Sequence, residues 1–330
     1  MEQISFFDGT KKFKIDKPIR LIELFAGYGS QALALKYLGV LIKHHRISEW
    51  AVKSIQAYKD MHFAEDNVDY SQGHELSEIK VFLLGRISFD YSTPATEKQI
   101  ERLSDQQART IFNNILATNN LGSITKIHGD ELNIVETDKY CYIMTYSFPC
   151  QDLSNAGVGK GMARGSGTRS GLLWEVERLL KECNEKPQVL LMENVPEVKG
   201  KKNANAFREW QTFLESLGYK NKWAVLNSKD FGVAQSRNRC FMVSVLGNYF
   251  YEMPKGFELK HRMKDFLDKE IEETYYLKDG TLNYFIRHSK ESEDKGNGFR
   301  FSPSDGSSEY AKTISTRAGG RMDDNFIKVE

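Results

Sequence analysis

The sequence predicts an α/β fold, in which a parallel sheet is covered by helices on both faces, followed by a second, smaller unit. Apolar runs of strand length alternate with amphipathic helical runs over the first 245 residues or so. Residues 246–330 instead show only short, mixed patterns and are strongly charged. We therefore expect domains at 1–245 and 246–330, with residues 64–127 as a polar, partly helical insertion in the first.

Four apolar runs are the strand candidates, and each ends in a polar or glycine-containing segment. In a doubly wound sheet, ligands bind beyond the carboxyl ends of the strands, so these segments should meet at one edge. The runs, each with the segment that follows it, are Ile19–Phe25 before a glycine-containing loop, Lys43–Ser48 before Glu49-Trp50, Tyr140–Phe148 before Pro149-Cys150, and Gln188–Met192 before Glu193-Asn194.

Two amphipathic stripes at helical spacing predict core helices between these strands, and Gly218 provides a stop signal for the second. In the second unit, Asp279-Gly280 and Asp305-Gly306 predict turns. The stripes are Leu172, Leu173, Val176, Leu179, Leu180 and Cys183, and then Phe207, Trp210, Phe213, Leu214 and Leu217.

The composition is that of an ordinary globular protein. The chain has 330 residues, 40% hydrophobic and 28% charged, which suffices for a sizeable core. It shows no apolar run of transmembrane or signal-peptide length, so we expect a cytoplasmic protein without a membrane partner. The net charge of +1 neither indicates nor excludes nucleic acid, because phosphate contacts need only a local basic face.

The first strand leads into Phe25-Ala26-Gly27-Tyr28-Gly29-Ser30, a short glycine loop that opens a helix. Glu49, about 20 residues further on, could accept both hydroxyls of a ribose, and Trp50 could pack against an adenine ring. The loop lacks the full dinucleotide pattern, which favours a cofactor with ribose and adenine but no phosphate, such as S-adenosylmethionine. The alternative is a surface acid beside a core aromatic.

A third candidate for this cofactor site is Asp130, with Glu131 beside it, in the segment His128-Gly129-Asp130-Glu131. The carboxylate of Asp130 could accept a hydrogen bond from the adenine amino group.

The chain has four cysteines and no CxxC pair, so we expect neither a metal site nor structural disulfides. Cys141, Cys183 and Cys240 lie in apolar patterns and should be buried. Cys150 differs, because it ends a strand beside the glycine-rich segment 154–171.

The segment 154–171 carries the basic residues Lys160, Arg164 and Arg169. It is either a surface loop or a basic lid that closes over a polyanion. We favour the lid, because the segment directly follows Cys150.

Five blocks, in this order, resemble the signature motifs of the DNA cytosine-5 methyltransferases, and the resemblance covers roughly residues 19 to 245. The blocks are Phe25–Ser30, Ser147-Phe148-Pro149-Cys150-Gln151, Arg169-Ser170-Gly171-Leu172, Glu193-Asn194-Val195 and Gln235-Ser236-Arg237-Asn238-Arg239.

The resemblance implies a Rossmann-like methyltransferase sheet and a target-recognition region at 246–330. The expected substrate is a cytosine flipped out of double-stranded DNA. The methyl group would come from S-adenosylmethionine, which leaves S-adenosyl-L-homocysteine as product. A restriction-modification or phage context would fit the family, but the DNA site is not readable from the sequence.

The same resemblance assigns roles to the catalytic residues. The Cys150 thiolate, flanked by Pro149 and Gln151, would add to carbon 6 of cytosine and so activate carbon 5. Glu193 would stabilise the charge at ring nitrogen 3. The remaining roles are that Asn194 would hold the turn, Arg239 would donate to the cytosine carbonyl, and Arg237 and Gln235 would support the pocket or contact phosphate.

The chain departs from the family pattern after the recognition region. It lacks a further helix-rich block and a late glycine- and asparagine-containing segment that complete the cofactor pocket, and it stops shortly after Thr313–Arg317. We therefore expect either a truncated product or half of a split enzyme that needs a second polypeptide.

Other classes of function stay open. One alternative is a DNA-binding subunit without turnover of its own, and another is an RNA-methylating relative. A cysteine hydrolase is disfavoured, because no histidine follows a comparable strand.

Overall fold

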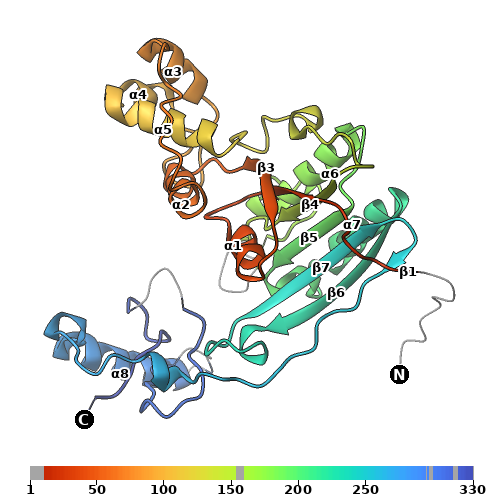
Figure 1. Cartoon of the computed structure of the whole chain (residues 1–330). Coiled ribbons are helices and arrows are strands. Elements are labelled where there is room, and N and C mark those ends of the chain that lie inside the picture. The colour runs from red at the N-terminus through yellow and green to blue at the C-terminus, as the bar shows by residue number, and fades with distance from the viewer. Residues whose placement is uncertain (1–10, 154–159, 295, 297–299, 315–318, 330) are drawn as a thin grey trace. The chain divides into compact units, whose positions relative to one another are not determined.

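A computed structural model describes residues 11–153, 160–294, 296, 300–314 and 319–329 (Figure 1). Contacts divide the chain into two compact units, which we describe separately. The first unit comprises Met1–Ala224 with Cys240–Met253, and the second comprises Val225–Arg239 with Pro254–Glu330. The second unit therefore includes Val225–Arg239, a segment that the sequence pattern placed in the first domain.

The first unit is built on a six-stranded sheet in the order β3-β2-β4-β5-β7-β6, and β1 and β8 form a separate pair. Its helices are α1 (Ser30–Tyr37), α2 (Val52–His62), α3 (Leu76–Leu83), α4 (Glu97–Glu101), α5 (Asp105–Ala117), α6 (Leu173–Glu182) and α7 (Ala204–Ser216). The strands are β1 (Lys11–Lys12), β2 (Ile19–Leu24), β3 (Ile42–Ser48), β4 (Cys141–Tyr146), β5 (Val189–Asn194), β6 (Tyr219–Asn227), β7 (Asn238–Leu246) and β8 (Tyr249–Phe250).

The predicted α/β class is confirmed, and the four predicted strands are β2, β3, β4 and β5. These four strands pair in parallel, as expected. The expectation of a wholly parallel sheet is wrong at β7, which runs antiparallel to β5. No α-helix separates β6 from β7 in the described chain, so the strand–helix alternation ends before β7.

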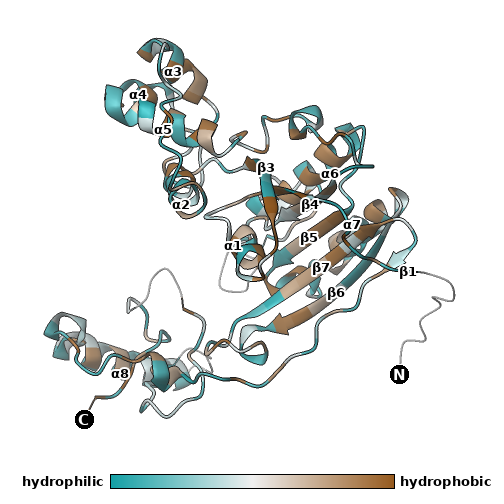
Figure 2. Cartoon of the chain, in the orientation of Figure 1, coloured by the Kyte–Doolittle hydropathy of each residue, from teal (hydrophilic) through white to brown (hydrophobic). Residues whose placement is uncertain are grey.

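Side chains alternate between the two faces of the sheet, and each face carries its own apolar core. Ile22 and Met144 belong to the cluster that includes the buried stripes of α6 and α7. Leu21 and Ile143 belong to the opposite cluster, with Ala32 of α1. Figure 2 shows the central strands as the apolar layer between these helices. The strands β2, β4 and β5 are therefore fixed in register, since a slip of one residue would exchange the two faces.

The insertion contains α3, α4 and α5, which share a core with α2. Ser104 and Thr96 cap two of its helices and accept hydrogen bonds from the third helical N–H. After α5 the chain returns to the sheet, where Asn120 pairs in parallel with Ile47 of β3. The end of the insertion thus lies beside the carboxyl end of β3.

The 3₁₀ turn η1 (Gly129–Leu132) packs against α6. A Cβ atom on Gly129 would lie 2.6 Å from Cβ of Glu182 and 2.7 Å from the backbone of Leu179 and Cys183. Only glycine fits this position, because a side chain would displace the last turn of the helix.

The second unit contains α8 (Asp279–Asp294) and a small aromatic core. Phe285 is buried there, with its ring centroid 5.6 Å from that of Phe301 and 5.7 Å from that of Phe326. The predicted turn at Asp279-Gly280 is wrong: these residues begin α8, where a carboxylate is favourable in the first turn. The turn at 305–306 is confirmed, since Asp305 accepts a hydrogen bond from the Ser307 N–H and Gly306 has φ +86°.

No helix in the described part of the chain is long and apolar enough to cross a membrane.

The tight site at Gly129 predicts opposite effects for two glycine substitutions. Gly129→Ala should lower the free energy of unfolding by about 1 to 3 kcal/mol, because the methyl group overpacks the contact with α6. Gly280→Ala, in α8 with open space around it, should be neutral or stabilising by up to about 1 kcal/mol. Urea denaturation followed by circular dichroism measures both. Wild-type stability in Gly129→Ala would contradict the packing described here.

Candidate active site

The glycine loop after β2 uses its own backbone donors internally. The Ala26 N–H donates to Ser48 O at 3.2 Å, and the Gly29 N–H donates to Ala26 O at 2.9 Å. The Gly27 N–H donates to Oε2 of Glu49 at 2.8 Å. Phe25 has φ +57°, a left-handed conformation that is strained for a non-glycine residue. These three N–H groups are therefore not a phosphate cradle.

Glu49 connects the end of β3 to this loop. Its Oε1 accepts the Ala51 N–H at 2.7 Å, while Oε2 holds Gly27. Burial raises the pKa of Glu49, and the N–H groups of Ala51 and Gly27 oppose that rise. Each carboxylate oxygen has a second lone pair, so the group retains acceptor capacity for a ligand hydroxyl.

Asn120 supports Glu49 and was missed by the sequence reasoning. Its side chain accepts the Glu49 N–H at 3.1 Å and donates to the Glu49 carbonyl at 2.8 Å. The half-buried Trp50 follows, and its carbonyl accepts the Ser88 N–H at 2.7 Å. No local pattern singles out Asn120, because it lies at the end of a polar insertion.

The turn after β4 presents Cys150, and three side chains from other elements hold this turn. Asn194 donates to the Phe148 carbonyl at 2.9 Å. Ser170 Oγ donates to the Pro149 carbonyl at 2.6 Å. Gln31 of α1 donates to Ser147 Oγ at 3.0 Å, which connects the helix after the glycine loop to the cysteine turn.

Asp152 fixes the far side of the same turn, and the sequence reasoning did not single it out either. Its buried carboxylate accepts the N–H groups of Arg169 at 2.9 Å and Ser170 at 3.3 Å, at the start of the 3₁₀ turn η2 (Arg169–Leu172). The exposed Gln151 lies between Cys150 and Asp152. The signal was a carboxylate two residues after the cysteine and two residues before the glycine-rich segment.

The four cysteines divide as predicted. Cys141, Cys183 and Cys240 are buried, and burial raises the pKa of each thiol to about 11. Cys150 is only partly buried. It is therefore the cysteine that a substrate can reach.

Glu193 and Asn194 end β5, next to the cysteine turn. Glu193 is half-buried and pairs in register with Phe241 of β7, while the buried Asn194 pairs with Cys240. Arg239 is the residue that precedes Cys240 in the chain.

The segment 235–239 belongs to the second unit, where hydrogen bonds to its backbone groups hold it in place. The Gln235 carbonyl accepts a hydrogen bond from Ser228 Oγ at 2.5 Å, and Gln235 pairs with Ala311. The Arg237 N–H donates to Asn227 Oδ1 at 3.0 Å. The predicted residues Gln235, Arg237 and Arg239 thus lie on one well-anchored segment.

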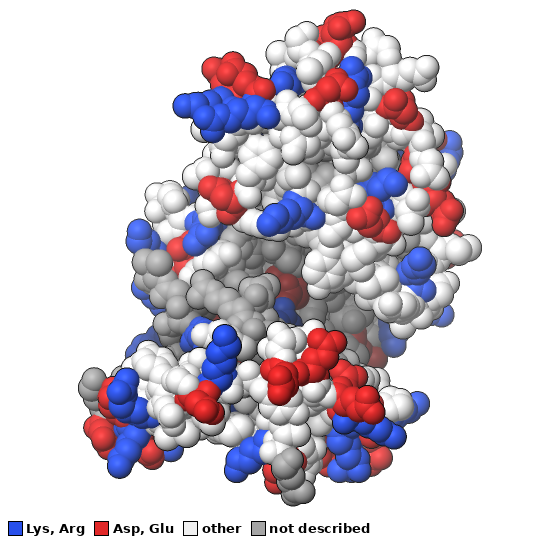
Figure 3. Space-filling model, turned by 90° about the vertical axis from the view of Figure 1, so that its left-hand side faces the viewer, with Lys and Arg blue, Asp and Glu red and all other residues white. Residues whose placement is uncertain are grey.

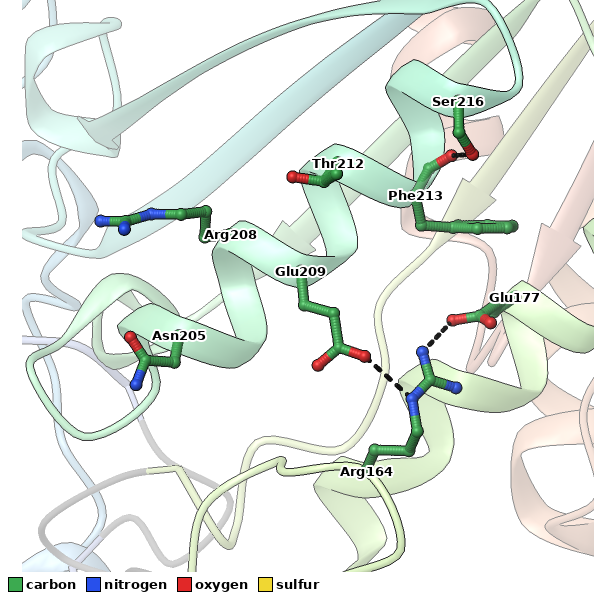
Figure 4. A pocket seen from close by; sticks show the side chains of 8 residues that line it. All are labelled: Arg164, Glu177, Asn205, Arg208, Glu209, Thr212, Phe213 and Ser216. Atoms are coloured by element: carbon green, nitrogen blue, oxygen red, sulfur yellow. Dashed lines mark hydrogen bonds and ion pairs between the residues drawn. The ribbon is translucent and has the colours of Figure 1, made fainter.

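Arg164, which was grouped with the residues expected to contact DNA, forms two ion pairs within the protein. Its guanidinium contacts Glu177 at 2.6 Å and Glu209 at 2.9 Å (Figure 4). It also lies 4.0 Å over the Trp174 ring. Two carboxylates therefore neutralise this charge. Arg164 holds the described part of the segment against α6 and α7, beside a surface hollow of about 450 Å³.

The remaining basic residues of the expected lid are exposed. Lys160 is exposed, and Arg169 is exposed with a long 3.4 Å hydrogen bond to Ser92. Residues 154–159 of the expected lid, and 315–317 of the segment expected to end the recognition region, lie outside the described residues.

Asp130 and Glu131 lie beside β3, since Arg46 of that strand donates a hydrogen bond to the Glu131 carbonyl at 3.2 Å. Both lie in η1, which packs on the last turn of α6, and that helix runs back toward the start of β5. The Glu131 carboxylate accepts the His128 N–H at 2.7 Å, which is a capping role. A contact of Asp130 with the adenine amino group stays a prediction.

Charged side chains of both signs are intermingled on the face shown in Figure 3. Among the described residues, no group of three or more His, Cys, Asp and Glu side chains could hold a metal ion.

Comparisons with known proteins agree on one family. The C-5 cytosine-specific DNA methylase family matches residues 85–326. Over 287 residues the chain is 38% identical to the orphan methyltransferase M.SssI of Spiroplasma monobiae. This alignment covers 85% of this chain and 72% of M.SssI. Over 270 residues it is 35% identical to the type II methyltransferase M2.ScrFI of Lactococcus lactis subsp. cremoris, with 80% and 72% covered.

Solved structures support the fold. The S. pombe Dnmt2 methyltransferase matches with a TM-score of 0.57 at 16% identity, over 94% of this chain and 74% of that one. The Entamoeba histolytica methyltransferase EhMeth matches with a TM-score of 0.58 at 15% identity, over 95% and 79%. The sequence matches and the ordered site residues lead to one conclusion: the chain belongs to the C-5 cytosine-specific DNA methylase family, the DNA (cytosine-5-)-methyltransferases.

Proposed function

We propose that this chain methylates carbon 5 of a flipped-out cytosine in double-stranded DNA through a covalent bond between Cys150 and carbon 6. The observation that carries the proposal is the contact of Gln31 with Ser147. This hydrogen bond joins α1, the helix that follows the glycine loop, to the turn that presents Cys150. Cys150 is partly exposed, whereas the other three cysteines are buried. Two candidate binding sites, for cofactor and for base, thus share one edge of the sheet.

The residues around the glycine loop fit S-adenosylmethionine better than a phosphate-bearing cofactor. The N–H groups of Gly27 and Gly29 are engaged within the protein, and Glu49 adds a negative charge that would repel phosphate. Nothing lies within 4 Å of the position that a Cβ on Gly27 would take, so a ligand can approach there. Glu49 would accept from the ribose, and Trp50 would pack on the adenine. The cofactor supplies an electrophilic methyl group.

Cys150 would act as the nucleophile. As a thiolate it adds to carbon 6 of cytosine, and the electron pair of the ring bond becomes available at carbon 5. After methyl transfer the proton on carbon 5 is lost to a base, which ordered water can provide. The carbon–sulfur bond then breaks and the aromatic ring is restored. Asn194 and Ser170 hold the turn in place during both steps.

Glu193 and Arg239 would bind the base itself. A carboxyl group at ring nitrogen 3 stabilises the charge that builds up as the thiolate adds. It also reads the exocyclic amine, which distinguishes cytosine from thymine. Arg239 would donate to the carbonyl oxygen, while Arg237 and Gln235 on the same segment would contact phosphate or support the pocket.

The substrate context follows from the similar proteins. The printed names of two of them, an orphan and a type II methyltransferase, support a role in DNA modification of the restriction-modification kind. The second unit, which carries Gln235–Arg239, would read the sequence of the site.

The covalent step predicts an adduct with duplex DNA that contains 5-fluorocytosine, in the presence of S-adenosylmethionine. Fluorine on carbon 5 prevents the final proton loss, so the protein should stay attached after denaturation. Cys150→Ser should abolish the adduct, and Cys141→Ala, at a buried position, should keep it. Gel electrophoresis with labelled DNA measures this. An adduct in Cys150→Ser would contradict the assignment, as would none in the folded wild type.

The role of Glu49 predicts weaker cofactor binding when its carboxylate is removed. Glu49→Ala should raise the dissociation constant for S-adenosylmethionine by about tenfold or more, because hydrogen bonds to a charged group contribute about 1.5 to 3 kcal/mol. Asp60→Ala, an exposed carboxylate on α2, should leave the constant unchanged. Isothermal titration calorimetry distinguishes the two. Equal affinities would remove Glu49 from the site.

The two arginines of the segment after Cys150 should respond differently to substitution. Arg164→Gln should lower thermal stability, with a cost of about 1 to 3 kcal/mol, because the buried Glu177 loses a charged partner. Arg169→Gln should keep stability but weaken duplex DNA binding and lower its salt dependence by about one counterion. Differential scanning fluorimetry and DNA titrations at several salt concentrations measure these effects. The reverse pattern would identify Arg164, and not Arg169, as the DNA contact.

A further inference from the structure

A chain of three titratable side chains is buried beneath the glycine loop, and the catalytic scheme does not use it. Glu23 of β2 is 1% exposed, and its Oε2 accepts the Tyr58 hydroxyl at 2.6 Å. Tyr58 of α2 is fully buried, and its oxygen lies 2.8 Å from Nδ1 of His44 on β3. We call Glu23, Tyr58 and His44 the Glu23 chain.

The Glu23 chain contacts the glycine loop at Gly29 and the start of α1 at Ala32. Oε1 of Glu23 lies 3.3 Å from the Ala32 N–H, in the first turn of the helix that follows the loop. A Cβ on Gly29 would lie 2.6 Å from the Tyr58 ring and 2.4 Å from Nε2 of His62. His62 also donates to the Tyr28 carbonyl at 2.9 Å, because a carbonyl can only accept. The loop therefore rests directly on Tyr58 and His62.

The hydrogen bonds of the Glu23 chain have two possible directions. When Glu23 is ionised, Tyr58 donates to it and accepts from Nδ1–H of His44, and the carboxylate also binds the Ala32 N–H. When Glu23 is protonated on Oε2, it donates to Tyr58, which must then donate to an unprotonated Nδ1. The second state leaves a neutral oxygen facing Ala32, and a neutral acceptor binds a helical N–H more weakly than a carboxylate does.

We propose that Tyr58 is a positioning residue for the cofactor loop, and that it acts by holding Glu23 in the ionised state that secures the loop and α1. The inference rests on the proposed function, since it takes Phe25–Ser30 to be the cofactor loop. It assigns to α2 a part in cofactor binding without contact to the cofactor.

The titration range of Glu23 makes this testable near neutral pH. Burial raises the pKa of Glu23 to about 7, and the hydrogen bonds from Tyr58 and Ala32 oppose that rise. Burial lowers the pKa of His44 to about 4, so this ring is neutral in this range, and burial also lowers the pKa of His62. The other charged groups that face the loop or the histidines are Glu49 and Lys36.

The two pH dependences of Glu23 have opposite signs. Because the pKa is raised in the folded chain, the protonated carboxyl stabilises folding below its ordinary value of 4.5, and this contribution is lost as pH rises to about 7. Cofactor affinity should instead increase over the upper part of that range, because the ionised form holds the loop. A purely structural role would give only the first dependence.

The experiment measures the dissociation constant of S-adenosylmethionine by calorimetry between pH 6 and 8.5 with the full chain. If only the ionised form binds, the wild-type constant should be about elevenfold higher at pH 6 than at its alkaline limit. Glu23→Gln should flatten this part of the profile, while any contribution from Glu49 remains. In Tyr58→Phe the carboxylate loses a donor and its pKa rises, so the profile should move to higher pH. A shift of one pH unit weakens binding at pH 7 by about fivefold.

Tyr70→Phe is the matched control, because Tyr70 binds Asp66 and lies outside the Glu23 chain. Its profile should coincide with that of the wild type. Wild-type binding at pH 7 should also release about half a proton, which calorimetry in buffers of different ionisation enthalpy measures without any variant.

A wild-type profile without slope, a Tyr58→Phe profile that coincides with wild type, or binding without proton release would each overturn the inference and leave the proposed function standing. No binding by the wild type at any pH would instead overturn the cofactor site of the proposed function, and the inference with it.

Discussion

The hydrogen bond from the Asn194 side chain to the Phe148 carbonyl is the interaction on which the site depends. It joins the ends of two neighbouring parallel strands at the point where the first turns away from the sheet. Because β4 is fully buried, this turn is the first place where the chain can present a reactive side chain to solvent. Ser170 and Asp152 then close the turn from the other side. The position of the Cys150 thiol is thus set by the side chains of Asn194, Ser170 and Asp152. Each of these side chains forms a hydrogen bond with the backbone of another segment.

The sequence predicted the parts of the site that strand topology alone brings together. The ends of β2, β3, β4 and β5 had to meet at one edge, because parallel strands share their direction, and the structure places Gly27, Glu49, Cys150 and Asn194 there. The core stripes of α6 and α7 were equally readable, since their spacing follows the helical period. Burial of three of the four cysteines followed from the apolar pattern around them.

What the sequence could not predict depends on contacts between segments far apart in the chain. Asn120 lies 71 residues from Glu49, and no local pattern links them. Arg164 resembled its neighbour Arg169 in the sequence, but only the fold decides that it forms ion pairs with Glu177 and Glu209. The antiparallel β7 was missed because it follows β6 without an α-helix in the described residues between them, so the strand–helix alternation ends there.

The burial of Cys141, Cys183 and Cys240 has a consequence for the protein under oxidising conditions. All four thiols are free, and the three buried ones are both inaccessible and protonated at neutral pH. Peroxide would therefore attack Cys150 first. A sulfenic acid formed there meets no accessible thiol of its own chain with which to form a disulfide. Recovery of an oxidised enzyme then depends on small thiols from outside, and further oxidation to the sulfinic acid would end its activity permanently.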